Sequence, residues 1–295
     1  MKIAISTDTS CTISRELAEK LSINVFPLNV IIDGEEYLDG VTINQDELCK
    51  AMRGGRIIKT STPPPSQIID YFQKLFQEGY DQIIHFCISS KLSSMSQLFS
   101  DISKSDFDNK VIVIDSYSVC SNMLSHVLYA YDELQKGHDI ETIVEGIEKR
   151  KKAGFISFVP ENLTALKNGG RISPAIAALG NLIGLKPVLL LKDGGLEKDA
   201  MTRNVKKALC EQIHNLKDDF PYKDYDYSMV SFDGNESLVT ALQNEFKAVF
   251  KDIEVPVLPI AINVCAHCGP GTVGIIVSPK INEHSLNEYL NSVKE

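Results

Sequence analysis

Short apolar segments alternate with amphipathic stretches through the first half of the chain. The short segments have the length of buried strands, and the longer stretches carry apolar residues every three to four positions, as a helix with one buried face does. Strands are expected at residues 2–6, 23–26, 82–88 and 110–114. Helices are expected at residues 14–21, 45–52, 66–77, 96–103, 119–134 and 140–151. The alternation predicts an α/β fold with a mainly parallel sheet.

A β-hairpin interrupts this pattern. Two short strand-like segments, 28–32 and 36–38, flank the dipeptide Asp33-Gly34. Asp-Gly favours the positive φ angles of a tight hairpin turn. We therefore expect these two segments to pair with each other.

The alternation starts again after residue 152. Strands are expected at residues 154–159, 187–191 and 227–232 and near Val255 and Val273, and helices from Glu161, through 174–178, from Thr202 and from Asn235. No long Pro/Gly linker separates the halves. The sequence thus predicts two tightly packed domains, a mainly parallel N-terminal α/β domain at 1–153 and a second α/β domain at 154–295.

Composition limits the classes of function. The chain has 295 residues, 39 acidic against 30 basic residues, and a net charge of -9. An acidic protein is a poor binder of nucleic acid, which requires a basic face. No apolar run approaches the roughly 20 residues that span a bilayer, and the first residues lack a signal-type apolar core. We therefore expect a cytoplasmic protein, with its seven cysteines as reduced, mostly buried thiols.

Two hydroxyl-rich segments could bind an anion. In Thr60-Ser61-Thr62, three hydroxyls precede three prolines, which hold the chain extended. The second segment, residues 89–96, contains five serines and follows an expected strand at the edge where α/β proteins bind ligands. The alternatives are a rigid loop for the first segment and elaborate helix capping for the second.

Two further segments carry single candidate side chains. Arg171 lies between Gly169-Gly170, which can end a helix, and Ser173-Pro174, which can start one. It could clamp a carboxylate or phosphate, or could bridge to a nearby acid. His267 lies beside a glycine-rich turn and could donate to an anionic ligand or bond a backbone carbonyl.

Motifs for metal binding and hydrolysis are not found in the sequence. Cys265 and Cys268 flank His267, but the chain has no second Cys/His pair with the spacing of a structural zinc site, so we expect no metal. No G-x-S-x-G or H-E-x-x-H motif is present. Asp8 and Asp115, at the ends of expected strands, could act as acids, although such residues more often cap loops. Neutral hydroxyls with one His and one Arg favour carboxylate binding over bond cleavage.

The order and spacing of several short motifs carry a resemblance that covers almost the whole chain. In chain order they are Thr7-Asp8-Thr9-Ser10, Thr60-Ser61-x-Pro63, Ser89-Ser90-x-Leu92-Ser93, Asp115-Ser116, Leu166-x-x-Gly169-Gly170-Arg171-Ile172-Ser173 with Gly180 and Lys186-Pro187, Arg203, and His267-x-Gly269-Pro270-Gly271-Thr272-Val273-Gly274. Together they resemble the DegV family, the fatty-acid-binding proteins also called FakB in bacterial fatty acid kinase systems.

The resemblance implies a lipid carrier without catalytic activity of its own. One long-chain fatty acid, such as palmitate or oleate, would lie in a tunnel between the two domains, with no other cofactor. The residues that match the family's carboxylate-binding positions are Thr60, Ser61, Ser90, Ser93 and His267, with Arg171 beside the head group. The carrier would present the acid to an ATP-dependent kinase that docks near Arg203. Transient contact with a membrane surface is compatible with such a role.

This sequence departs from the family pattern in the proline-rich loop, at Ser94-Met95 and in the cysteines beside His267. Two other functions remain open. One is a hydrolase or acyl-transferase that uses Ser90 or Ser93 with His267. The other is a kinase-partner or regulatory module whose ligand is not a fatty acid.

Overall fold

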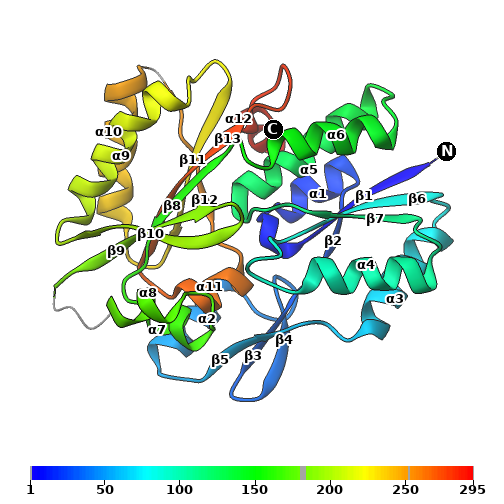
Figure 1. Ribbon diagram of the computed structural model, residues 1–295, viewed down its shortest axis with the longest axis horizontal. Helices are drawn as coiled ribbons and strands as arrows, with labels where there is room; N and C mark the ends of the chain where they lie inside the picture. The colour runs from blue at the N-terminus through cyan, green and yellow to red at the C-terminus, as the bar shows by residue number, and fades with distance from the viewer. Residues whose placement is uncertain (1, 180–183, 252, 295) are drawn as a thin grey trace.

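Three β-sheets organise the molecule, whose computed structural model describes residues 2–179, 184–251 and 253–294 (Figure 1). A four-stranded sheet comes from the first half of the chain and a six-stranded sheet from the second half. In Figure 1 they lie to the right and to the left, and a small three-stranded sheet lies below. The α/β fold class is confirmed; the boundary between residues 153 and 154 stays a prediction. Gly180 lies outside the described residues.

The four-stranded sheet is parallel throughout, as predicted. Its strands, in spatial order, are β2 (Asn24–Phe26), β1 (Ile3–Asp8), β6 (Gln82–Cys87) and β7 (Val111–Asp115). Helices covering it are α1 (Arg15–Leu21), α3 (Pro65–Gln77), α4 (Met95–Asp106), α5 (Cys120–Gln135) and α6 (Ile140–Arg150).

Both faces of this sheet are buried. Along β6, Ile83 belongs to the apolar cluster that includes Phe72 and Phe99 of α3 and α4, and the next residue, Ile84, to the cluster that includes Leu124 of α5. Successive strand residues point to opposite faces, and so a strand buried on both sides reads as a continuous apolar run. This is why the sequence revealed these strands.

The three-stranded sheet is antiparallel. Strand β3 (Asn29–Ile32) pairs with β4 (Glu35–Leu38) and with β5 (Ile58–Ser61), while α2 (Gln45–Arg53) connects β4 to β5. Asp33 and Gly34 have φ angles of 52° and 93°, which confirms the predicted hairpin turn. Strand β5 was not expected: its four residues are too few to show alternation, and three prolines follow soon after it.

The six-stranded sheet is antiparallel except for its last pair. Its order is β10 (Gly195–Thr202), β9 (Lys186–Lys192), β8 (Phe155–Val159), β13 (Thr272–Pro279), β11 (Tyr225–Phe232) and β12 (Val257–Pro259). The remaining helices of the second half are α7 (Thr164–Asn168), α8 (Pro174–Leu179), α9 (Val205–Asp219), α10 (Glu236–Phe250), α11 (Ile262–Cys268) and α12 (Leu286–Asn291).

Several predicted boundaries in this half were wrong. Thr202 ends β10 and does not start a helix; α9 begins at Val205. Strand β10 itself was not predicted, since residues 197–200 are all exposed and show no alternation of apolar and polar positions. The helix expected from Glu161 begins at Thr164, and the strand expected near Val255 lies at β12. Helix α11 was not predicted, since its seven residues span only about two turns.

The end of the chain returns to the first half. Ile281 and Leu286 belong to the same apolar cluster as Ile5 and Leu124. Arg150, at the end of α6, donates to the backbone oxygens of Pro279 and Lys280. The last segment therefore ties the two larger sheets together. Among the residues described, no helix is both long and apolar enough to cross a bilayer.

Candidate functional site

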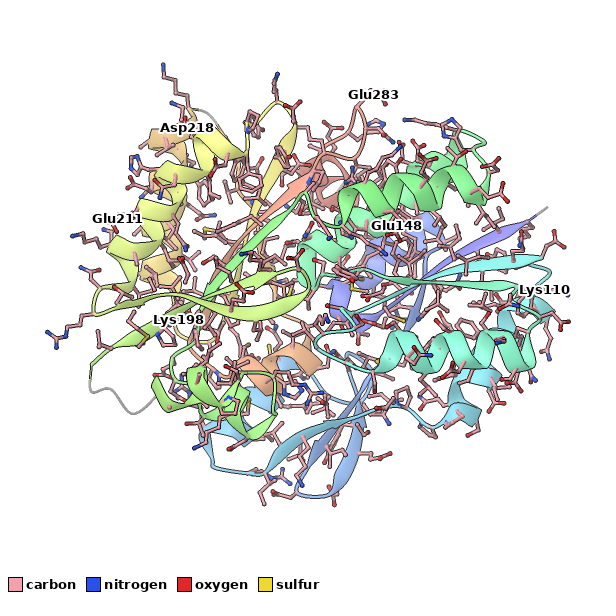
Figure 2. The ribbon with its side chains drawn as sticks, in the orientation of Figure 1. Lys110, Glu148, Lys198, Glu211, Asp218 and Glu283 are labelled. Atoms are coloured by element: carbon pink, nitrogen blue, oxygen red, sulfur yellow. The ribbon has the colours of Figure 1, made fainter. Side chains whose placement is uncertain are left out.

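A cavity lies between the two larger sheets, with α11 and β5 on a third side. Side chains fill most of the gap between the ribbons, while Glu211 on α9 stands at the outer edge (Figure 2). The remaining space, including its open mouth, is about 1120 Å³. Both halves supply mainly apolar walls, including Leu28, Ile88, Met95, Val119, Ile156, Phe158, Leu166, Leu191, Val230, Ile260 and Ile276. The cavity can therefore hold a large apolar group.

Thr60 and His267 meet at the wall of this cavity. Thr60 Oγ1, near the end of β5, lies 2.8 Å from His267 Nε2 in the last turn of α11. Ser61, the last residue of β5, also lines the cavity, and its buried Oγ has no partner among the described residues. The structure thus brings three predicted residues together.

His267 is neutral at pH 7. Burial, and then the positive charge of Arg171, lower the pKa of His267 from 6.5 to about 4. Its other nitrogen, Nδ1, has no hydrogen-bond partner in the described part of the chain. That nitrogen faces Gly169, where a Cβ atom would approach it to 2.2 Å. The Nδ1 side of the ring is therefore fixed by packing.

Arg171 connects the two sides of the site through backbone oxygens. Its Nε donates to Leu92 O at 3.1 Å and its Nη1 to Gly169 O at 2.5 Å. It forms no ion pair with any acid among the described residues. Burial lowers the pKa of Arg171, although the guanidinium stays charged at pH 7. The structure therefore does not show the alternative interpretation of the sequence, in which Arg171 forms a bridge to a nearby acid.

The serine-rich segment contributes Ser93 but not Ser90. Ser93 lines the cavity, next to the Leu92 carbonyl that Arg171 binds. Ser90 is exposed and outside the lining, because its N–H donates to Asp115 and holds it at the sheet edge. Ser94 is the N-cap of α4 but makes no capping bond through its side chain.

Two asparagines that the sequence did not reveal also line the cavity. Asn29 on β3 and Asn263 on α11 are both buried. Each is a single polar residue in an apolar segment, so no pattern marked it. Asn263 lies four residues before His267, and this helical spacing is the signal that could have suggested it.

Two cysteines beside the cavity, Cys120 and Cys265, are protonated thiols, because burial raises the pKa of each well above its usual value. Cys268, in the same region, is also buried. All seven cysteines are free. Among the described residues, no group of three or more His, Cys, Asp or Glu is placed to hold a metal ion.

Arg203 lies away from the cavity lining. It is exposed in the short connection between β10 and α9. Its predicted role in docking a partner stays a prediction.

The comparisons with known proteins agree on one family. The model of the DegV family, described as uncharacterised proteins, matches residues 2–280. A DegV domain-containing protein of Clostridium acetobutylicum is 32% identical, over 95% of this chain and 99% of that protein.

Solved structures of this family have the same fold. A DegV family protein from Thermus thermophilus, described for its fatty acid binding, matches with a TM-score of 0.86 at 29% identity, over 95% of this chain and all of that one (100%). A Thermotoga maritima protein described as having a fatty acid binding function matches with a TM-score of 0.81 at 26% identity, over 95% and 99%. This chain, with its two main sheets and the cavity between them, belongs to the DegV family.

Proposed function

We propose that this chain binds one long-chain fatty acid, such as palmitate or oleate, in the cavity between the two larger sheets. The observation that carries the proposal is a mainly apolar cavity, about 1120 Å³ with its open mouth included, whose wall also carries the hydroxyls of Thr60, Ser61 and Ser93. The fatty acid binding described for the relatives from Thermus thermophilus and Thermotoga maritima supports it.

The head-group site follows from a chain of contacts. Ser93 is next to Leu92, whose carbonyl binds Arg171; Arg171 binds the Gly169 carbonyl. Gly169 packs on His267, and His267 bonds Thr60, which is next to Ser61. We therefore assign the carboxylate to the group Thr60, Ser61, Ser93, His267 and Arg171. Ser90 is left out because it lies outside the lining.

The hydrocarbon tail of the acid governs its affinity, and the contacts of its head group govern how readily it exchanges. Each buried CH₂ contributes about 0.8 kcal/mol, so the apolar walls supply most of the affinity. A buried carboxylate is costly unless it is hydrogen-bonded. The hydroxyls can supply these bonds, since donation from His267 Nε2 to Thr60 Oγ1 leaves the Thr60 O–H free to donate to the acid. Neutral donors of this kind leave the acid able to dissociate.

We further propose that the bound acid is presented to an ATP-dependent fatty acid kinase in the cytoplasm. The kinase would transfer the γ-phosphoryl group of ATP to the carboxylate, giving an acyl phosphate and ADP. Arg203 is exposed and outside the cavity, as a docking residue must be. Arg203→Glu should abolish acyl phosphate formation with the kinase of the same cell and leave fatty acid affinity unchanged; unchanged turnover would exclude this docking site.

A serine hydrolase has no comparable support. A catalytic histidine needs an acid to orient it, yet among the described residues Nδ1 of His267 has no partner and packs on Gly169. Its Nε2 bonds Thr60. The geometry therefore favours binding over hydrolysis.

A double variant tests the head-group assignment. Thr60→Ala/Ser93→Ala should fold and lose about 5- to 150-fold in palmitate affinity, measured by titration calorimetry on delipidated protein, because two net hydrogen bonds are worth about 1–3 kcal/mol. The matched control is Ser100→Ala/Thr240→Ala, which removes two helix hydroxyls that bond only backbone oxygens. Native mass spectrometry of the wild type should show a bound fatty acid. A wild type that neither carries nor binds one would overturn the proposed function.

A further inference from the structure

Helix α11, which carries His267, begins without a side-chain cap of its own. Its N-cap residue, Ala261, has no side-chain acceptor, so the N–H groups of the first turn need acceptors from elsewhere. Asp39, which follows β4 of the three-stranded sheet, supplies one, because its Oδ2 accepts from the N–H of Asn263 at 3.0 Å. A residue 224 positions earlier in the chain therefore takes the place of the missing cap.

Ser10 holds the same helical turn through the side chain of Asn263. Asn263 Nδ2 donates to Ser10 Oγ at 2.8 Å, and Ser10 is fixed in turn because its N–H donates to Asp8 Oδ1 at 2.7 Å. Asp39 is also fixed, since its own N–H donates to Leu28 O at 2.9 Å. The first turn of α11 is thus held at two points by residues of the first half.

The contact between Asp39 and α11 is buried and charged. Asp39 is 5% exposed. Burial raises the pKa of Asp39 from 3.8 to about 6, and its hydrogen bonds, first of all the one from the Asn263 N–H, oppose this rise. The carboxyl is therefore mostly ionised at pH 7. An ionised acceptor forms a stronger hydrogen bond than a neutral one, and a negative charge is favoured at the start of a helix.

This first turn is directly connected to the proposed head-group site. Asn263 lies four residues before His267, about one helical turn, so both belong to one short rigid element. Nε2 of His267 lies 2.8 Å from Thr60 Oγ1. Asp39 and Ser10 are both outside the cavity lining. A displacement of α11 at its first turn would therefore move the His267 ring relative to Thr60 without any change in the cavity wall itself.

We propose that Asp39, together with Ser10, is a positioning residue for the head-group site, because it holds the first turn of α11 and thereby fixes His267 against Thr60. This inference rests on the proposed fatty-acid-binding function and adds residues that do not touch the acid. Asp39 acts on the acid through His267, whose bond to Thr60 leaves the Thr60 O–H free to donate to the carboxylate.

Substitutions in the delipidated full chain test the effect on affinity. Asp39→Ala removes the accepting oxygen and should weaken palmitate binding about five- to tenfold in titration calorimetry, as expected when one net hydrogen bond is lost. Ser10→Ala should weaken binding about threefold. Asp39→Asn keeps an oxygen that can accept from the Asn263 N–H, so its affinity should stay within about twofold of the wild-type value.

Asp226 provides the matched control. It is also a buried carboxylate, 7% exposed, and it accepts from the N–H of Leu286 at the start of α12 at 2.8 Å, from the distant strand β11. Helix α12 carries none of the residues assigned to the carboxylate. Asp226→Ala should therefore lower the urea midpoint of unfolding as Asp39→Ala does, but should leave palmitate affinity unchanged.

The ring signals of His267 report its position in the absence of ligand. In NMR spectra of the folded, delipidated protein, Asp39→Ala and Ser10→Ala should shift these signals. The pKa of His267 should rise from about 4 towards 6.5 in both, because a displaced ring is less buried. Asp39→Asn and Asp226→Ala should match the wild type. A cap that only stabilised the fold would leave the signals of folded molecules unchanged.

Each outcome decides for or against the positioning role. Either wild-type palmitate affinity or wild-type His267 signals in Asp39→Ala overturns it, and so does an equal loss of affinity in Asp226→Ala. A loss in Asp39→Asn as large as that in Asp39→Ala overturns the assignment to the accepting oxygen. If Asp39→Ala does not fold, Ser10→Ala decides by the same two measurements. A wild type that binds no fatty acid overturns the proposed function, while the NMR comparison still tests the hold on His267.

Discussion

Gly169 and Gly170 are adjacent and yet are required for different reasons. Gly169 has an ordinary φ of −75°, but an added Cβ would come within 2.2 Å of His267 Nδ1. Gly170 has a φ of 69°, and a Cβ there would meet nothing within 4 Å. Gly169 therefore supplies space for the histidine ring, whereas Gly170 supplies a left-handed backbone conformation that ends the helix.

Alanine at each glycine should separate these two effects. Gly169→Ala should displace the His267 ring, break its bond to Thr60 and weaken fatty acid binding about tenfold, the worth of one charge-assisted or buried hydrogen bond. Gly170→Ala should lower the free energy of unfolding by about 1–2 kcal/mol and leave affinity intact. Binding titrations and urea unfolding of both variants measure this. Equal affinity in the two variants would contradict the packing role of Gly169.

At the level of elements, two strand-end carboxylates hold the loops beside the cavity. Asp8, at the end of β1, accepts from the N–H groups of Ser10 and Ile88 at 2.7 and 2.9 Å. Asp115, at the end of β7, accepts from Ser90 and Tyr117. Both residues thus bind loop backbone, which is the more common of the two roles that their positions suggested. These bonds hold the loops at the edge of the parallel sheet in place, including the loop that carries Ser93.

Asp8 should make stability depend on pH. Burial raises the pKa of Asp8 from 3.8 to about 6, so the charged form is disfavoured in the folded state. The favourable contribution of the protonated Asp8 carboxyl to the free energy of unfolding is fully present below pH 3.8 and is lost as pH rises through 6. Relative to Asp8→Asn, the wild type should therefore gain about 2 kcal/mol of unfolding free energy between pH 7 and pH 4.

The comparison of the two proteins at each pH removes the effect of other groups. Burial lowers the pKa values of His85, His126 and His267 to about 3, 3 and 4. These histidines therefore lower the free energy of unfolding of the protein as the pH falls below 6.5. That loss is common to both proteins. Unfolding curves that run parallel across the pH range would refute the assignment to Asp8.

The sequence predicted elements with a repeated pattern and missed those without one. The strands of the parallel sheet were clear because burial on both faces gives each of them a continuous apolar run. The hairpin was clear because its turn contains the dipeptide Asp33-Gly34. Strand β5 depends on pairing with β3, which lies more than 20 residues earlier. Strand β10 pairs with the preceding strand β9, but its exposed residues show no alternation, and α11 is too short to show a period. The same distinction holds in the site: His267 stood out beside its glycines, but Asn29 reaches the cavity wall beside Ser61 only because β3 pairs with β5.

At the scale of the whole molecule, a few polar contacts join the two halves in addition to the apolar clusters that both halves share. Arg53 of α2 donates to Glu161 at 2.9 Å and to Asp233 at 2.7 Å, which lie in loops of the second half. Ser89 Oγ donates to Gly194 O at 2.7 Å and joins the first sheet to the β9–β10 turn. Exposed ion pairs such as these contribute little individually. A ligand that contacts both walls would therefore add substantially to the cohesion of the two halves.

Fatty acid should stabilise the protein as one unit. At a free concentration one hundred times the Kd, binding adds about 2.7 kcal/mol to the free energy of unfolding. For a chain of this size we expect the Tm to rise by about 4 °C relative to delipidated protein. Calorimetry with and without palmitate measures the shift, with the Thr60→Ala/Ser93→Ala variant as the unresponsive control. An unchanged Tm at saturating palmitate would contradict binding of palmitate to the folded chain.

The three-stranded sheet brings several polar residues of the cavity wall from one continuous stretch of the chain. Residues 28–62 supply Asn29, Thr60 and Ser61, while the larger sheets supply most of the apolar wall. Substitutions in this one stretch can alter which polar head is accepted without remodelling the space for the hydrocarbon chain. Duplication of the gene, followed by substitutions within residues 28–62, would then change lipid selectivity with little effect on folding. Exchange of this segment between relatives would be a direct way to redesign that selectivity.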